Sequence, residues 1–252
     1  MHAARDELSP GGAGPIVVSG MLAEQLAKEL GAGAVAGAVV VDDDGTRASA
    51  AEVLVHVMAG EPSEADETLV GSADRHGTPV VIVQLWPQAD WTPPFILTPF
   101  VVECRAGEGF PLREIADRIV EASENGPVLA SRLPELQPAL AHGVVRQAMI
   151  RSALFSLAGD GKGATRPLIA LEQIRMLARL RAATTGASDS DSTPLVAGAA
   201  AAALSFGYAL REVARAARGV LPAPVADVVV AAGGTWVLAK AFQTLEARLP
   251  SA

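Results

Sequence analysis

The run PVVIVQL at Pro79–Leu85 is almost continuously apolar, and this pattern indicates the fold class. A strand that helices cover on both faces has this pattern, whereas a strand with one solvent face alternates. Further short apolar runs lie on either side of it: Pro15–Gly20, Ala34–Val41, Glu52–Met58 and Phe100–Glu103. Stretches with helical spacing separate these runs: Leu22–Leu30, Ser63–Arg75 and Leu112–Ala122. The alternation predicts a mostly parallel sheet with helices on its faces.

The composition limits the classes of protein that this chain fits. Half of its 252 residues are apolar but only 4% are aromatic, so Ala, Val and Leu must build the core. The net charge is −8 and there is no basic run, which argues against a general nucleic-acid surface. Cys104 is the only cysteine, which excludes an intramolecular disulfide and a cysteine-based zinc site. A reducing cytoplasm fits this, and residues 1–14 are expected to be a disordered lead without a signal peptide.

The second half of the chain has a different pattern. The composition changes near Asn125-Gly126-Pro127, and no convincing strand follows Leu136. The candidate helices are Leu136–Leu157, Pro167–Thr184, Leu195–Arg218 and Ala223–Arg248. We therefore expect an α/β domain at residues 15–124, followed by an all-α, alanine-rich helical domain at residues 135–248.

The order of features in the α/β domain resembles a bacterial GTPase of the Era-like, TRAFAC-type kind. Asp42 and Gly45 fit that family's D-x-x-G motif, and Ala51–Gly60 matches its next strand. The family's guanine-reading N-K-x-D motif should follow Pro79–Val83, but residues 84–90 read QLWPQAD and lack the Asn and the Lys. The family's S-A-K motif is also degenerate, because residues 103–109 keep the glycines and lose the serine and the lysine.

The largest departure from the family is at the first strand. A phosphate-binding loop needs G-x-x-x-x-G-K-[ST], whose lysine neutralises the phosphates and whose hydroxyl holds Mg²⁺. Here the strand is followed by Gly20-Met21-Leu22-Ala23-Glu24, so a triphosphate would meet Glu24 instead of a lysine. The resemblance therefore implies a degenerate domain that does not hydrolyse GTP, with no cofactor, no metal site and no catalytic residues.

The helical domain resembles a GTPase-associated helical family of unknown function. Arg166–Gly186 looks like its signature helix: Pro167 opens the helix, and Gln173, Ile174 and Met176 match its Q-[IL]-x-M core. The family ends this helix in Tyr-Gly, whereas this chain has Thr185-Gly186. The similarity covers roughly residues 135–248. It implies attachment to GTPase domains, and several members of the family are predicted membrane proteins.

The last two candidate helices leave two interpretations open. Leu195–Leu210 has 16 residues without a charge, which at about 1.5 Å per residue is shorter than a bilayer core of about 30 Å. A second uncharged segment is Val228–Ala239. Either the two pack in a helical bundle that uses alanines for close contacts, or they form a hairpin in or on the cytoplasmic membrane.

Three other features of the sequence bear on function. Asp42 and Asp44 fit the D-x-D-G-T opening of haloacid-dehalogenase-like phosphatases, in which they would be nucleophile and acid/base. His56 alternates with valines, which favours a residue on a strand face over a metal ligand. Trp86, Pro87 and Trp91 form an apolar loop. The favoured interpretation is that it covers the core, and the alternative is contact with a partner or membrane.

The sequence thus predicts a non-catalytic, pseudo-GTPase-like binding, scaffold or regulatory protein. We expect a protein partner, with an active GTPase as one candidate, no nucleic acid, and a location in the cytoplasm or at the cytoplasmic face of the membrane. The alternatives are a membrane-anchored structural protein working through its hairpin and an Mg²⁺-dependent phosphatase using Asp42 and Asp44. The candidate partner or membrane contacts are Trp86, Pro87, Trp91, Leu195, Phe206, Tyr208 and Trp236.

Overall fold

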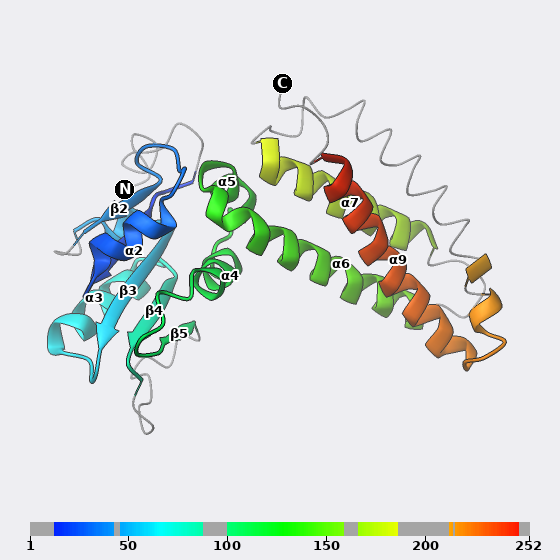
Figure 1. The fold of residues 1–252 in the computed structure, drawn as a ribbon, viewed down its shortest axis with the longest axis horizontal. Coiled ribbons are helices and arrows are strands. Elements are labelled where there is room, and N and C mark those ends of the chain that lie inside the picture. Colours follow the sequence, from blue (N-terminus) through cyan, green and yellow to red (C-terminus); the bar gives the residue numbers. More distant parts are fainter. Residues whose placement is uncertain are drawn as a thin grey trace. The chain divides into compact units, whose positions relative to one another are not determined.

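A computed structural model describes residues 13–42, 46–87, 100–158, 166–185, 212–213 and 215–246. The chain divides into two compact units, Met1–Leu140 and Ala141–Ala252. The first unit contains all described strands, and the second is helical (Figure 1). This confirms the predicted succession of an α/β part and an all-α part.

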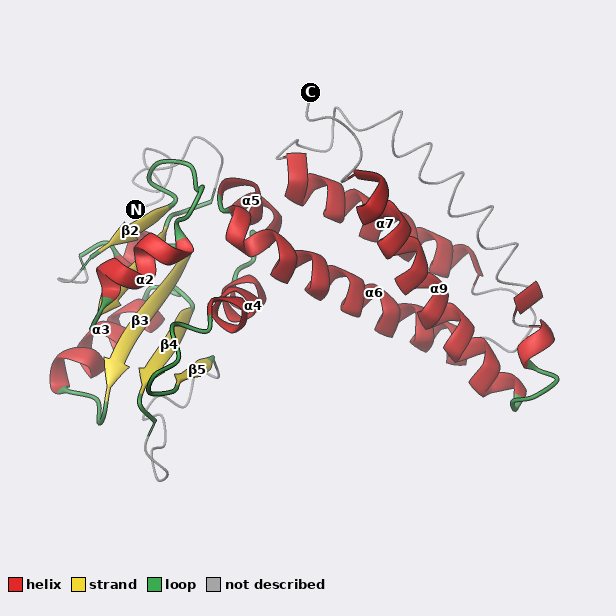
Figure 2. Ribbon diagram, viewed as in Figure 1, coloured by secondary structure: helices red, strands yellow, loops and turns green. Residues whose placement is uncertain are grey.

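Five parallel strands form the sheet of the first unit (Figure 2). They are β1 (Ile16–Gly20), β2 (Val39–Val41), β3 (Val53–Ala59), β4 (Val80–Leu85) and β5 (Val101–Cys104). Their spatial order is β2-β1-β3-β4-β5, and every neighbouring pair is parallel. The predicted apolar run became β4, and all of its residues are buried. Only β2 is much shorter than the predicted run, with three residues at one edge.

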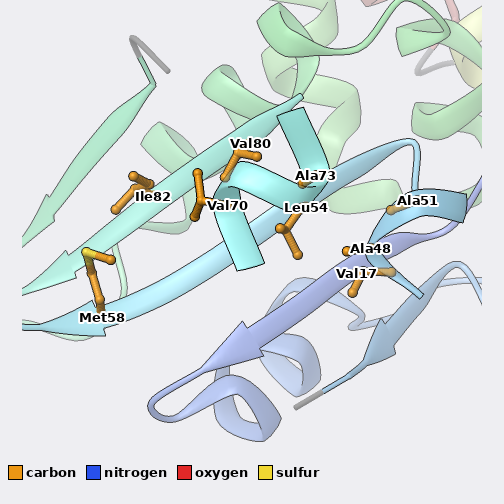
Figure 3. Packing of buried hydrophobic residues seen from close by; sticks show 9 residues of the cluster. All are labelled: Val17, Ala48, Ala51, Leu54, Met58, Val70, Ala73, Val80 and Ile82. Carbon is orange, nitrogen blue, oxygen red and sulfur yellow. The ribbon is translucent and has the colours of Figure 1, made fainter. Parts of the chain in front are cut away.

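Helices cover both faces of this sheet. One face packs against α3 (Glu64–Arg75) and the short 3₁₀ helix η1 (Ala48–Ala50), and Figure 3 shows its apolar cluster. The cluster consists of Val17, Ala48, Ala51, Leu54, Met58, Val70, Ala73, Val80 and Ile82. The alternating strand residues point to the other face, where α2 (Ala23–Leu30) and α4 (Leu112–Ala122) lie.

Helix ends follow local signals in the sequence. Ser63 caps α3: its side chain accepts a hydrogen bond from the Asp66 backbone N–H, and the Asp66 side chain accepts from the Ser63 backbone. This reciprocal capping box lies at the start of the predicted helical stretch Ser63–Arg75. Helix α2 ends at Leu30, the last residue of the predicted stretch Leu22–Leu30. Leu22, which precedes its first residue, provides no side-chain cap.

Two short helices after α4 were not predicted. They are α5 (Gly126–Arg132) and η2 (Pro134–Leu136), both too short to show a helical period in the sequence. Both contact α4 or each other and belong to the first unit. Ala13, which the predicted lead included, is fully buried, and the Arg132 side chain donates to its carbonyl at 2.9 Å. Residues 1–12 lie outside the described part of the chain.

The second unit contains three described long helices. They are α6 (Gln137–Ala158), which begins in the first unit, α7 (Arg166–Thr185) and α9 (Ala223–Glu246). Thr235 of α9 is fully buried, with its Oγ1 3.2 Å from Ser152 Oγ of α6, and it accepts a hydrogen bond from Gln173 of α7 at 3.3 Å. These polar contacts tie the three helices together. Most of the predicted helix Leu195–Arg218 lies outside the described residues.

Candidate functional site at the carboxyl edge of the sheet

The strand order has a switch point between β1 and β3. The chain leaves β1 toward β2 on one side and leaves β3 toward β4 on the other. In open α/β sheets, ligands bind beyond the carboxyl ends of the strands at such a switch point. The groups that follow β1, β2, β3 and β4 therefore define the candidate site.

The connection from β1 to α2 is very tight. Only Met21 and Leu22 separate the two elements. Gly20 has φ +90°, and a Cβ at this position would lie 2.1 Å from the Val57 carbonyl oxygen of β3. The Met21 N–H donates to the same oxygen at 2.9 Å, and Leu22 has φ +58°. A residue other than glycine is uncommon in this left-handed backbone region, and its backbone is strained there. The close contact between Gly20 and β3 holds the turn in place.

The side chains of this turn are apolar or acidic. Met21 and Leu22 are 50% and 48% exposed, and Glu24 lies in the first turn of α2. The only basic residue of α2 is Lys28, in its last turn. An anion bound at the first turn of α2 would therefore meet backbone N–H groups and the Glu24 carboxylate. It would meet no side-chain cation.

A hydrogen-bonded chain of Ser19, His56 and Asp66 lies beneath this turn. Ser19 Oγ is 2.9 Å from His56 Nδ1, and His56 Nε2 is 2.8 Å from Asp66 Oδ1. An ionised Asp66 accepts from Nε2–H, which leaves Nδ1 of a neutral imidazole to accept the Ser19 hydroxyl proton. Ser19 is opposite His56 in the β1–β3 register. The three side chains thus connect β1, β3 and α3.

This chain has the residue types of a serine hydrolase triad, but its burial points to another role. The Ser19 side chain is fully buried and His56 is 2% exposed. A nucleophile needs an open position beside it for the reacting carbon, which a fully buried hydroxyl does not have. The arrangement therefore fits a structural tie inside the sheet–helix interface. His56 is a strand-face residue, as its alternation with valines indicated.

Against the effect of burial, hydrogen bonding lowers the pKa of the Asp66 carboxyl group. Burial, the largest single influence, raises its pKa, but the opposing influences together lower the pKa of Asp66 below its ordinary value of 3.8. These are hydrogen bonds from the Ser63 side chain and backbone, a hydrogen bond from His56, and the charge that His56 carries when protonated. Asp66 therefore stays ionised under neutral conditions and keeps both its cap and its bond to His56.

Asp42 follows β2 and holds the turn after it. Its Oδ2 accepts a hydrogen bond from the Arg47 backbone N–H at 2.6 Å, and Thr46 donates to its Oδ1 at 3.4 Å. Asp42 is 9% exposed and lies at the edge of the sheet, away from the switch point. Both oxygens serve the turn, which favours a structural role over that of a phosphatase nucleophile. Asp44 lies outside the described residues.

Trp86 follows β4 and is exposed. Its side chain is 52% exposed, so it does not cover the core, which was the favoured interpretation of this loop. Its backbone has φ +52°, and its N–H donates to the Cys104 carbonyl at 2.9 Å. The next residue, Pro87, is half-buried, and Trp91 lies outside the described residues. Met21 and Leu22 lie two strands away, at about 10 Å across the sheet. Trp86 therefore adds a further apolar side chain to the carboxyl edge.

Cys104 ends β5 and is buried, as expected for a structural thiol. Burial is the main influence that raises its pKa above the ordinary value of 9.0, and the charges of Glu108 and Glu29 raise it further. A thiol with a raised pKa is a poor nucleophile at neutral pH. Cys104 is therefore no candidate for covalent catalysis.

A second concave region lies at the opposite, amino edge of the sheet. It is a cleft of about 420 Å³ that Glu52, Asp74 and Glu124 line. Glu52 is buried and accepts hydrogen bonds from the side chains of Ser123 and Asn125, so it stabilises the turn after α4. Across the described part of the chain, no group of three or more His, Cys, Asp or Glu residues is arranged to hold a metal ion.

The remaining candidate contacts belong to the second unit. Trp236 lies on α9 and is 48% exposed, whereas Leu195, Phe206 and Tyr208 lie outside the described residues.

Sequence reasoning missed Ser19, although a serine and a histidine in otherwise apolar strands indicate a buried polar contact. Comparison with known protein families, with curated proteins and with solved structures found no match to this chain.

Proposed function

We propose that this chain is a non-catalytic binding module, a scaffold or regulator that binds a protein partner at the carboxyl edge of its sheet. The observation that carries the proposal is the turn after β1. Where a doubly wound sheet would bind a ligand, the chain has two residues with half-exposed apolar side chains, Met21 and Leu22.

Three features support this proposal. The turn has no room for a phosphate-binding loop, and no lysine or free hydroxyl is available in it. Leu22 and Trp86 are both held in the left-handed backbone region, and strain of this kind concentrates at functional sites. Exposed apolar groups at such a site suit a protein surface better than a charged small molecule.

The resemblance to Era-like GTPases suggests the kind of partner. A domain that keeps the order of strands and loses the phosphate-binding groups suits a role beside an active GTPase, in the cytoplasm or at the cytoplasmic face of the membrane. In this proposal Met21, Leu22, Trp86 and Pro87 form the partner contact.

The first experiment is calorimetry of the purified full chain with GTP and Mg²⁺. We expect no saturable heat, because the turn after β1 provides no cation for the phosphates. Uptake of GTP at micromolar concentrations that requires Mg²⁺ would overturn the proposal.

The second experiment concerns the surface itself. A protein that copurifies with the full chain is purified and titrated with the wild type, Met21→Glu, Trp86→Ala and a control, Val35→Glu, whose side chain is 57% exposed elsewhere in the first unit. Truncating an interface anchor costs more than about 1 kcal/mol, so we expect roughly tenfold weaker binding for the first two variants. Equal weakening by Val35→Glu would contradict the assignment of this surface.

A second candidate is a membrane-anchored structural protein, which α9 favours. Its segment Ala223–Thr244 has 22 residues and is apolar enough to cross a bilayer, and 33% of its most apolar part is buried inside the protein. At about 1.5 Å per residue, 22 residues reach the roughly 30 Å of a bilayer core. Recovery of the chain only in detergent after carbonate washing of membranes would support this candidate.

A further inference from the structure

The antiparallel pair α6 and α7 gives the second unit two distinct ends. Arg179 donates to Gln147 Oε1 at 3.3 Å, and Arg151 Nη1 lies 3.4 Å from Glu172 Oε2. The two helices therefore run in opposite directions. The end of α6 and the start of α7 consequently lie at the same end of the pair (Figure 2).

Exposed apolar side chains gather at that end. They recur at helical spacing on both helices, and each is between 43% and 59% exposed. We call this surface the leucine end, and it consists of Ile150, Leu154, Leu157, Leu168 and Leu171. Leu154 is one turn beyond Arg151, and Leu168 is one turn before Glu172, so the two leucines continue the face on which that ion pair lies.

Helix α9 adds two apolar side chains at the same end. It runs in the same direction as α7, and its Thr235 lies beside Gln173 and Ser152 (Figure 2). Its first turns, which carry the exposed Val225 and Val229, therefore lie toward the leucine end. All three described long helices of the unit thus present apolar groups there.

Arginines follow immediately behind the leucine end. We call Arg146, Arg151, Arg175 and Arg179 the arginine row. Arg151 and Arg175 share one buried carboxylate, that of Glu172, and Arg179 is bonded to an uncharged amide. The arginine row contains four positive charges, and its ion pairs involve one negative charge, that of Glu172, so the net charge is +3.

The charge of the whole unit has the same sign. Residues 141–252 contain 12 Lys and Arg against 7 Asp and Glu, a net charge of +5. Residues 1–140 contain 8 against 21, a net charge of −13. A charge asymmetry of this size between two parts of one chain suggests interaction with an anionic partner such as a membrane.

We propose that the leucine end and the arginine row bind the surface of an anionic lipid bilayer. From Ile150 to Leu157 the helix rises about 10 Å, which matches the roughly 5–10 Å that apolar groups penetrate at a membrane interface. The arginines then lie at the level of the lipid phosphates. An acidic protein would match the arginines too, but apolar side chains at the tips of three helices suit a soft apolar layer.

The contact is peripheral and does not require α9 to cross the membrane. Thr235 lies in the middle of α9, is fully buried, and makes polar contacts with α6 and α7. Moving α9 into the bilayer would leave Gln173 and Ser152 buried without that partner, which is unfavourable. This inference concerns the second unit alone and does not depend on the partner-binding proposal.

The test is flotation of the full chain with vesicles. One set is pure phosphatidylcholine, and the other contains about 30% phosphatidylglycerol as the anionic lipid. We expect binding to the anionic vesicles, weaker binding to the neutral ones, and release by carbonate washing. Equal binding to both sets, no binding to either, or retention after carbonate would each overturn the proposal.

Variants then separate the two parts of the surface. Leu154→Glu combined with Leu168→Glu is expected to abolish flotation, while Val35→Glu in the first unit leaves it unchanged. Arg146→Gln combined with Arg179→Gln removes two charges without breaking an ion pair of the described residues and should weaken binding about thirtyfold at low salt. Circular dichroism checks that each variant is folded. Wild-type flotation by both double variants would contradict the proposal.

Discussion

His56 Nε2 lies 2.8 Å from Asp66 Oδ1, so a buried ring on β3 is bonded to the carboxylate that caps α3. The other ring nitrogen is bonded to Ser19 of β1. One histidine therefore connects two strands and a helix at the switch point between β1 and β3. This connection has measurable consequences for the stability of the first unit.

Asp66→Ala is expected to lower the free energy of unfolding by about 2–4 kcal/mol. The change removes a capping box, which contributes about 1 kcal/mol, and leaves a buried His56 N–H without its acceptor, which costs about 1–3 kcal/mol. Urea unfolding at neutral pH measures the loss. Glu67→Ala, in the same exposed turn, is the control and should change stability by less than about 0.5 kcal/mol. Equal losses in the two variants would contradict the proposed role of Asp66.

The stability that Asp66 provides should depend on pH. Its folded pKa is lowered below the ordinary 3.8, so the unfolded chain takes up this proton first as the pH falls. The contribution is therefore fully present above about pH 5 and is lost as the pH falls through the folded pKa. The difference in unfolding free energy between the wild type and Asp66→Asn should be constant from about pH 7 to 5 and shrink below about 3.8. A difference that grows in acid would contradict this assignment.

Gly20→Ala should be much more harmful than Gly60→Ala, although both glycines have positive φ. A Cβ on Gly20 would lie 2.1 Å from the Val57 carbonyl oxygen, so β1 would have to move away from β3. We expect a loss of at least about 3 kcal/mol, or a failure to fold. No atom lies within 4 Å of a Cβ on Gly60, so that variant should lose only about 1–2 kcal/mol. Thermal unfolding of both variants decides between these expectations.

Thr235→Val tests the polar tie of the second unit. Valine has a similar shape but cannot bond to Gln173 or Ser152, both of which are buried. We expect a loss of about 1–3 kcal/mol in the transition that follows helix content. Thr244→Val on the same helix, where the hydroxyl is exposed and bonds only to the Lys240 carbonyl, should have little effect. Similar losses in both would mean that the buried contacts contribute nothing beyond helix propensity.

The sequence predicts most elements of the first unit because their signals are local. The apolar run of β4, the capping residue Ser63 and the amphipathic spacing of Leu112–Ala122 each act within one element, and Leu112–Ala122 is helical from end to end. The bond between Ser19 and His56 could not be predicted in this way. It depends on the register between β1 and β3, which places two residues 37 positions apart opposite each other, and no local pattern specifies that register.

Trp86 shows the same limit at the candidate site. An aromatic residue after a buried strand is normally drawn into the core, and the sequence favoured that outcome. Its side chain is instead exposed, because the backbone takes a left-handed turn while its N–H stays bonded to the Cys104 carbonyl. The turn direction, and not the residue type, decides where this side chain points.

The three-residue β2 and the four-residue β5 are the outer strands of a sheet whose interior is rich in valine. Long, flat outer strands invite the sheets of other molecules to join them and to start aggregates. These outer strands offer few free backbone groups, and the exposed Glu103 places a charge on one of them. A chain in which half of the residues are apolar thus gains protection against edge-to-edge polymerisation from the brevity of its outermost strands.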